Sequence, residues 1–97
     1  MEVLETPEFA RWMRALRDPL GKRQIVGRIA RIAAMGNFGD FASVGGGVSE
    51  LRIHVGPGYR VYYTLRGEDV VILLAGGDKG SQERDMQRAK EMAARVK

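Results

Sequence analysis

The side chains best suited to chemistry in this chain lie on either side of a Gly-Pro-Gly turn. Arg52 and His54 precede the turn, and Arg60 and Tyr62 follow it, each pair separated by one residue. Because strand side chains alternate between the two faces of a sheet, strands joined by this turn carry all four residues on one face. Two guanidinium groups beside an imidazole suit a phosphate-bearing polyanion, although a solvated outer sheet face has the same pattern.

The turn predicts a β-hairpin with Pro57 at its tip, because β-branched and aromatic residues fill both arms. The expected pairs are Val55 with Tyr59, His54 with Arg60, Ile53 with Val61, Arg52 with Tyr62, Leu51 with Tyr63 and Glu50 with Thr64. In this register one face of the hairpin is apolar and the other holds the polar side chains. A slip of one residue would mix the two sets, so the pattern itself favours the alignment.

Composition restricts the class of protein. The chain of 97 residues is 44% hydrophobic with 13 glycines, which suits one globular domain with a modest core. It has no cysteine and one histidine, which excludes disulfides and argues against a metal site. No apolar run approaches the ~20 residues of a membrane span, and no basic-then-apolar signal opens the chain. We therefore expect a cytoplasmic protein that needs no cofactor, no metal and no membrane.

Basic residues are concentrated in the first third of the chain. The net charge is only +4, but seven basic residues and one acidic residue, Asp18, lie between Arg11 and Arg31. Such an excess favours nucleic acid or an acidic protein as the partner, whereas the same residues also suit the solvated side of two helices. Lys22 and Arg23 are the candidates for RNA contact in this segment.

Local signals place these residues in an α+β domain. Thr6-Pro7 and Asp18-Pro19 are helix starts, each a capping residue followed by proline, and Gly36 ends the second helix. Two helices so close together predict an antiparallel helical hairpin. The other expected elements are a weak edge strand over 1–5, a glycine-rich loop over 37–47, a buried central strand over 70–75 and a last helix capped by Ser81. We expect all helices on one face of a small antiparallel sheet, in a single domain spanning residues 1–97.

Three segments of the chain resemble the RelE/ParE toxin superfamily, and within it the HigB-like, phage-derived addiction module killer toxins. They are residues 44–54, 56–63 and 73–79, which read VGGGVSELRIH, GPGYRVYY and LLAGGDK. The resemblance implies a RelE-like fold and the toxin half of a type II toxin–antitoxin pair. RelE-type toxins cut mRNA on the translating ribosome without a metal, whereas ParE-type toxins inhibit DNA gyrase.

The resemblance also implies partners. The first is a cognate antitoxin, expected to be a helix-turn-helix DNA binder, through which alone the chain would reach operator DNA. The others are the ribosome and its mRNA.

The same resemblance assigns roles to single residues. Arg52 and His54 stand where RelE-type toxins commonly have lysines, and Arg60 matches an arginine that contacts phosphate. Lys79 matches a basic residue of the RelE-type site. RelE-type toxins often have a tyrosine near the last helix as general base, but residues 82–86 read QERDM here. Either His54 or Asp85 takes that role, or the mechanism differs.

Cleavage of RNA without a metal uses a ribose 2′-hydroxyl as nucleophile on the adjacent phosphate. Arg52 and Arg60 would stabilise charge on the phosphorane oxygens, and His54 would move protons near neutral pH. Tyr62 would stack on a base, and Lys79 would hold phosphate or the leaving oxygen. The plainer alternatives are a surface histidine, a packed tyrosine and a solvated lysine.

Three functions therefore stay open from the sequence. A ribosome-dependent endoribonuclease leads, because a basic patch with a proton-transfer group is more than a pure binder needs. A toxin that inhibits gyrase by binding comes second. A non-catalytic RNA-binding module comes third, since exposed aromatic platforms are scarce.

Overall fold

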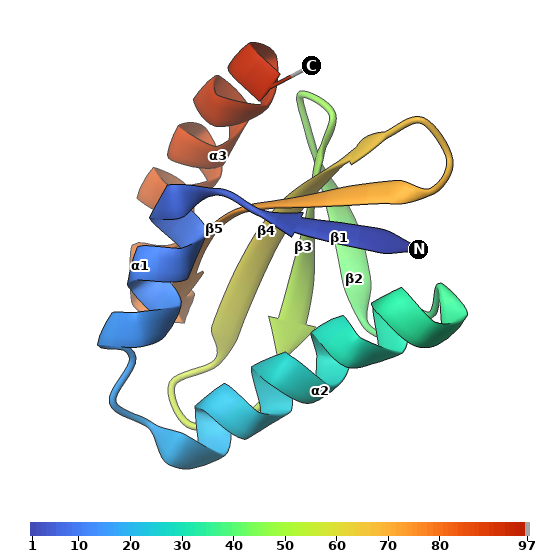
Figure 1. Ribbon diagram of the computed structural model, residues 1–97. Coiled ribbons are helices and arrows are strands. Elements are labelled where there is room, and N and C mark those ends of the chain that lie inside the picture. Colours follow the sequence, from blue (N-terminus) through green and yellow to red (C-terminus); the bar gives the residue numbers. More distant parts are fainter. Residues whose placement is uncertain (97) are drawn as a thin grey trace.

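The computed structural model describes residues 1–96; Lys97, the last residue of the expected domain, lies outside them. The elements are β1 (Glu2–Glu5), α1 (Pro7–Ala15), α2 (Pro19–Met35), β2 (Phe41–Gly45), β3 (Val48–Ile53), β4 (Tyr59–Arg66), β5 (Val70–Asp78), the 3₁₀ turn η1 (Lys79–Ser81) and α3 (Gln82–Val96). The strands form one sheet in the order β1-β5-β4-β3-β2 (Figure 1). Only β1 and β5 are parallel. The α+β class and the prediction that β5 is an interior strand buried on both faces are confirmed. None of the described helices is both long and apolar enough to cross a membrane.

The first two helices begin at the predicted caps. The Thr6 hydroxyl accepts a hydrogen bond from the Phe9 backbone N–H at 3.2 Å, and the Asp18 carboxylate accepts one from Gly21 at 3.0 Å. α2 ends at Gly36, whose φ of 64° is the left-handed conformation that favours glycine. Each helix packs on the sheet separately, so α1 and α2 diverge from their connection (Figure 1) without the expected side-by-side packing.

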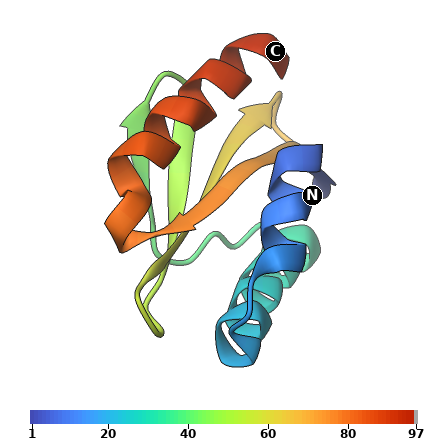
Figure 2. The same ribbon diagram turned by 90° about the vertical axis from the view of Figure 1, so that its left-hand side faces the viewer.

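Helices cover both faces of the sheet, with α1 and α2 on one side and α3 on the other (Figure 2). The α1/α2 side buries Phe9, Ile25, Ile32, Leu51, Ile53, Tyr59, Val61, Tyr63, Val71 and Leu73. The α3 side buries Val48, Tyr62, Ile72, Leu74, Ala75, Ala89, Met92 and Ala93. The expectation that all helices lie on one face is therefore wrong. The reason is β5, which is apolar on both faces and needs a helix over each.

The β3–β4 hairpin has the predicted faces in a register shifted by two residues. The observed pairs are Ile53–Tyr59, Arg52–Arg60, Leu51–Val61, Glu50–Tyr62, Ser49–Tyr63 and Val48–Thr64. An even shift leaves every side chain on its predicted face, so Arg52 and Arg60 share a face as direct neighbours. The connection takes residues 54–58, where Gly56 and Gly58 both have positive φ. His54 therefore lies outside the strand, and its predicted pairing with Arg60 is wrong.

The segment expected to be a loop over 37–47 contains the edge strand β2. It pairs antiparallel with β3, and Gly45 at its end and Gly46 and Gly47 in the following turn all have positive φ. Gly45, Gly46 and Gly47 serve this change of direction, and the glycine-rich composition of the segment outweighed the alternation of the strand, whose burial alternates along its length.

Candidate functional site

The polar residues of the hairpin form two rows across the α3 side of the sheet. In the first row, Arg52 on β3, Arg60 on β4 and Gly77 on β5 are successive cross-strand neighbours. In the second row, Glu50 and Tyr62 are neighbours in the same way. We call these residues, with Gln82 and Asp85 of α3, the α3-side cluster.

A buried carboxylate holds the α3-side cluster together. The Glu50 side chain is 3% exposed and lies 3.3 Å from Nε of Arg60 and 3.8 Å from Nε of Arg52. The Gln82 amide donates to both carboxylate oxygens at 3.3 Å. A buried charge is tolerated only with such partners. Glu50 received no role from the sequence, although its place on the face of both arginines was the signal available.

The two arginines differ in their access to solvent. The Arg52 side chain is 38% exposed and lies 3.9 Å from Asp40, whereas that of Arg60 is 10% exposed. Nε of Arg60 is buried, and its ion pair with Glu50 lacks the alignment of a hydrogen bond. The guanidinium of Arg52 is therefore accessible to a ligand, whereas Arg60 contributes its positive charge from beneath the surface.

Tyr62 is fully buried beneath the start of α3, and its hydroxyl donates to the Gln82 carbonyl oxygen at 3.5 Å. Burial, followed by the charge of Glu50, raises the pKa of Tyr62. The predicted stacking of Tyr62 on a base is wrong, because neither face of the ring is accessible.

Asp85 lies at the start of α3 against the first row of the cluster. Its carboxylate accepts a hydrogen bond from the Ser81 hydroxyl at 2.5 Å and is 17% exposed. A Cβ at position 77 would overlap this carboxylate, so glycine there lets Asp85 sit against the sheet. Because Gly77 is the cross-strand neighbour of Arg60, the alternative base lies close to the row of arginines.

His54 and Lys79 lie at the hairpin end of the cluster. The His54 side chain is 67% exposed, and its Nε2 lies 2.5 Å from a carboxylate oxygen of Asp40. The hydrogen bond with His54 lowers the pKa of Asp40. Lys79 is exposed in η1, beside Gly58 of the same hairpin connection. Both side chains are accessible, but Nε2 of His54 reaches a substrate group only after it leaves the Asp40 carboxylate.

Lys22 and Arg23 lie apart from the other candidates, on α2 and so on the opposite side of the sheet. Arg28 of α2 instead reaches the end of β3. It donates to the backbone oxygens of Arg52 at 2.6 Å and of Asp40 at 2.8 Å, which fixes the segment that carries Asp40. Within residues 1–96, no three His, Cys, Asp or Glu side chains are grouped so as to hold a metal ion.

Comparisons with known proteins relate the chain to a family and to solved structures. Residues 11–97 match the model of the family described as phage derived protein Gp49-like (DUF891). An uncharacterized protein of Haemophilus influenzae is 43% identical over 93 residues, which are 96% of this chain and 93% of that protein.

Two solved structures share the fold. A chain of the intact E. coli RelBE toxin–antitoxin complex matches with a TM-score of 0.63 at 14% identity, over 79% of this chain and 94% of that one. A mutant of E. coli toxin RelE in the free state matches with a TM-score of 0.62 at 14% identity, over 90% and 95% of the two chains. The RelE-like fold expected from the sequence is confirmed.

Proposed function

The chain belongs to the phage-derived Gp49-like family and has the RelE fold, and from that premise we propose that it is the toxin of a type II toxin–antitoxin pair. Its activity would be metal-independent, ribosome-dependent cleavage of mRNA, which blocks translation. The observation that carries this proposal is the α3-side cluster, in which an accessible and a buried arginine share the buried carboxylate of Glu50. Charge held in a fixed, partly dry position is the main means of stabilising a phosphorane.

The two arginines would share the work on the phosphate. Arg52 is the accessible group, and its planar guanidinium matches the geometry of phosphate oxygens. Arg60 is held by Glu50 beneath the surface, so it adds a fixed positive charge without reorganising as the reaction proceeds. Lys79 would bind a flanking phosphate.

Two groups compete for the proton-transfer step. Asp85 is already held in place by Ser81 and Gly77, next to the row of arginines. His54 belongs to the residue type that most often moves protons near neutral pH, but its Nε2 is already engaged by the Asp40 carboxylate. They lie on different elements, His54 in the hairpin connection and Asp85 on α3, so single substitutions separate their roles.

An antitoxin is the proposed protein partner, supported by the RelBE toxin–antitoxin complex among the structures that share the fold. We expect a helix-turn-helix protein encoded beside this chain, which binds operator DNA for both. Co-expression should abolish toxicity and yield a complex that co-purifies. A neighbouring product that neither binds nor protects would contradict the toxin–antitoxin assignment.

The first experiment is expression in growing cells followed by mapping of transcript 5′ ends. We expect new ends inside translated reading frames, because cleavage would require the ribosome. Intact transcripts accompanied by DNA damage would contradict this activity and support a ParE-like gyrase inhibitor.

The second experiment is single-turnover cleavage of mRNA on programmed ribosomes, with binding measured in parallel. Loss of the proton-transfer group should slow cleavage about 10²–10⁴-fold at unchanged affinity, in His54→Gln or in Asp85→Asn. Glu83→Gln on the same exposed turn of α3 is the matched control for Asp85. Arg52→Ala should weaken both binding and cleavage. Full activity in all three site variants would show that the α3-side cluster is not the active site.

A further inference from the structure

α2 contains a glycine that the fold itself does not require. Gly27 lies in the middle of the helix, and a Cβ built there meets no atom within 4 Å. Glycine inside a helix is less stable than alanine because of its backbone freedom. At position 21 of the same helix, packing explains the glycine, since a Cβ there would press on Tyr59 and Asp18. At Gly27 the missing side chain leaves space only on the outside of the molecule.

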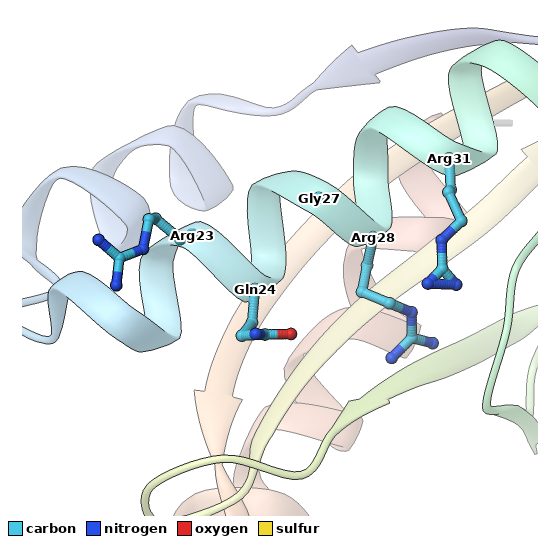
Figure 3. Close-up of a pocket in the computed structure, with 5 residues that line it drawn as sticks. All are labelled: Arg23, Gln24, Gly27, Arg28 and Arg31. Carbon is cyan, nitrogen blue, oxygen red and sulfur yellow. The ribbon is translucent and has the colours of Figure 1, made fainter.

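Two hollows meet at Gly27 on the solvent side of α2. One, of about 510 Å³, is lined by Pro19, Lys22, Arg23, Val26 and Gly27. The other, of about 260 Å³, is lined by Arg23, Gln24, Gly27, Arg28 and Arg31 (Figure 3). The first four residues of the larger hollow stand at positions i, i+3, i+4 and i+7. This is the arrangement that receives one side chain from a neighbouring helix.

The exposed side of α2 is apolar and basic at once. Leu20, Val26 and Met35 are 46%, 52% and 67% exposed, and they are three of the six large apolar side chains exposed in the described part of the chain. α2 has four basic residues and no acidic one. Among residues 1–96, neither Arg23 nor Arg31 forms an ion pair. Exposed apolar side chains next to a hollow with a charged rim are typical of a protein-binding site.

We propose that this side of α2 docks an amphipathic, acidic helix of the antitoxin. An apolar side chain of that helix fills the larger hollow, Gly27 allows close approach, and carboxylates meet Arg23 and Arg31. The identity of the partner rests on the proposed function. A second copy of this chain is disfavoured because two α2 helices would bring eight positive charges together. RNA is disfavoured because Leu20 and Val26 offer nothing to phosphate, so Lys22 and Arg23 are reassigned from RNA to protein contact.

The first test uses two synthetic helical peptides with one leucine stripe, flanked by Glu in one and by Lys in the other. Calorimetry with the purified chain should detect the acidic peptide only. Gly27→Trp fills the junction of the hollows, and Val26→Glu adds a repelling carboxylate, so each should weaken binding about tenfold. Circular dichroism checks that both variants stay folded.

The control is Arg14→Glu, an equal reversal of charge on α1, compared with Arg31→Glu. Loss of binding in Arg31→Glu alone supports docking on α2, whereas equal loss in both variants would reveal general attraction and overturn the proposal. Equal binding of the two peptides, or no binding, would overturn it as well. The proposal would also be overturned if a single-stranded RNA oligomer bound the chain and Gly27→Trp weakened this binding as much as it weakened binding of the peptide.

The second probe, the product encoded beside this chain, separates the docking surface from the proposed function. If this product binds the wild type and Gly27→Trp equally well, the docking surface is wrong and the toxin–antitoxin assignment stands. If it neither binds nor protects while the acidic peptide binds at Val26, the assignment fails, and α2 remains a docking surface for acidic helices.

Discussion

The two sides of the sheet are built differently, although the same strands supply both. On the α1/α2 side, the buried side chains that β3 and β4 present to the helices are apolar or aromatic: Leu51, Ile53, Tyr59, Val61 and Tyr63. On the α3 side, the same strands bury Glu50 and Arg60 next to an apolar cluster. Glu50 and Leu51 are adjacent and both lie within 2% of complete burial, yet one is a carboxylate. Replacing a buried ion pair by well-packed apolar side chains is often neutral or stabilising, so stability alone does not account for the pair of Glu50 and Arg60.

The largest effect is expected from a substitution at Glu50, on the α3 side of the sheet. Glu50→Leu keeps the side chain similar in size but leaves the charge of Arg60 buried without its partner. The free energy of unfolding should fall by about 3–5 kcal/mol, as measured by urea denaturation.

The matched control is the double variant Glu50→Leu with Arg60→Met. It removes both charges and should recover most of the lost stability while abolishing cleavage. A single variant that unfolds like the wild type would show that the pair is too well hydrated to distinguish the two sides.

On the other side of the same strand, Leu51→Ala opens a cavity in a fully buried apolar cluster. The expected loss is about 2–5 kcal/mol in the free energy of unfolding. Cleavage per folded molecule should stay unchanged at temperatures where the variant is folded, because Leu51 faces away from the α3-side cluster. A loss of activity without a loss of stability would mean that the two sides are coupled.

Most of the apolar side of the sheet could be predicted from the sequence, but little of the polar side could. Alternation in 48–65 determines which residues face each way, and an even register shift leaves that pattern intact. The alternation therefore could not reveal the shift of two residues, which leaves His54 outside the strand. Residues 70–75 indicate two apolar faces for β5, but which helix covers each face depends on contacts between segments far apart in the sequence.

The candidate site was harder to predict because its contacts join distant segments. The sequence placed Arg52 and Arg60 on one face, which the structure shows. It could not show that Gln82, 32 residues along the chain, would hold Glu50. Nor could alternation distinguish an exposed Tyr62 from one covered by α3. Local periodicity gives the face of a strand and says nothing of what lies over it.

A smaller effect compares the two glycines of α2. Gly27→Ala should raise the free energy of unfolding by about 1 kcal/mol, because alanine favours the helix and its Cβ meets nothing. Gly21→Ala should destabilise the protein, since its Cβ would lie 2.5 Å from the Tyr59 ring. Thermal unfolding of both variants gives the signs. A destabilised Gly27→Ala would mean that this position is constrained within the molecule after all.

The smallest effect concerns Asp18, which caps α2 and accepts a hydrogen bond from the Tyr59 hydroxyl at 2.7 Å. The Gly21 backbone N–H and then Tyr59 lower the pKa of Asp18 from its ordinary value of 3.8. A lowered pKa means that the folded protein favours the carboxylate. Its contribution to stability is therefore complete above pH 3.8 and is lost as the pH falls through the lowered pKa. Asp18→Asn should show less acid destabilisation than the wild type in urea denaturation.

The same contact predicts an alkaline effect of opposite sign. The hydrogen bond to Asp18 is the main cause that raises the pKa of Tyr59 to about 12 from 10.0. The neutral phenol is thus favoured in the folded state, and its contribution is complete below pH 10 and lost as the pH rises toward 12. Tyr59→Phe should flatten stability over this interval, although Tyr62 and Tyr63 keep part of the slope. An unchanged slope in Tyr59→Phe would show that the Asp18–Tyr59 contact does not link α2 to the hairpin energetically.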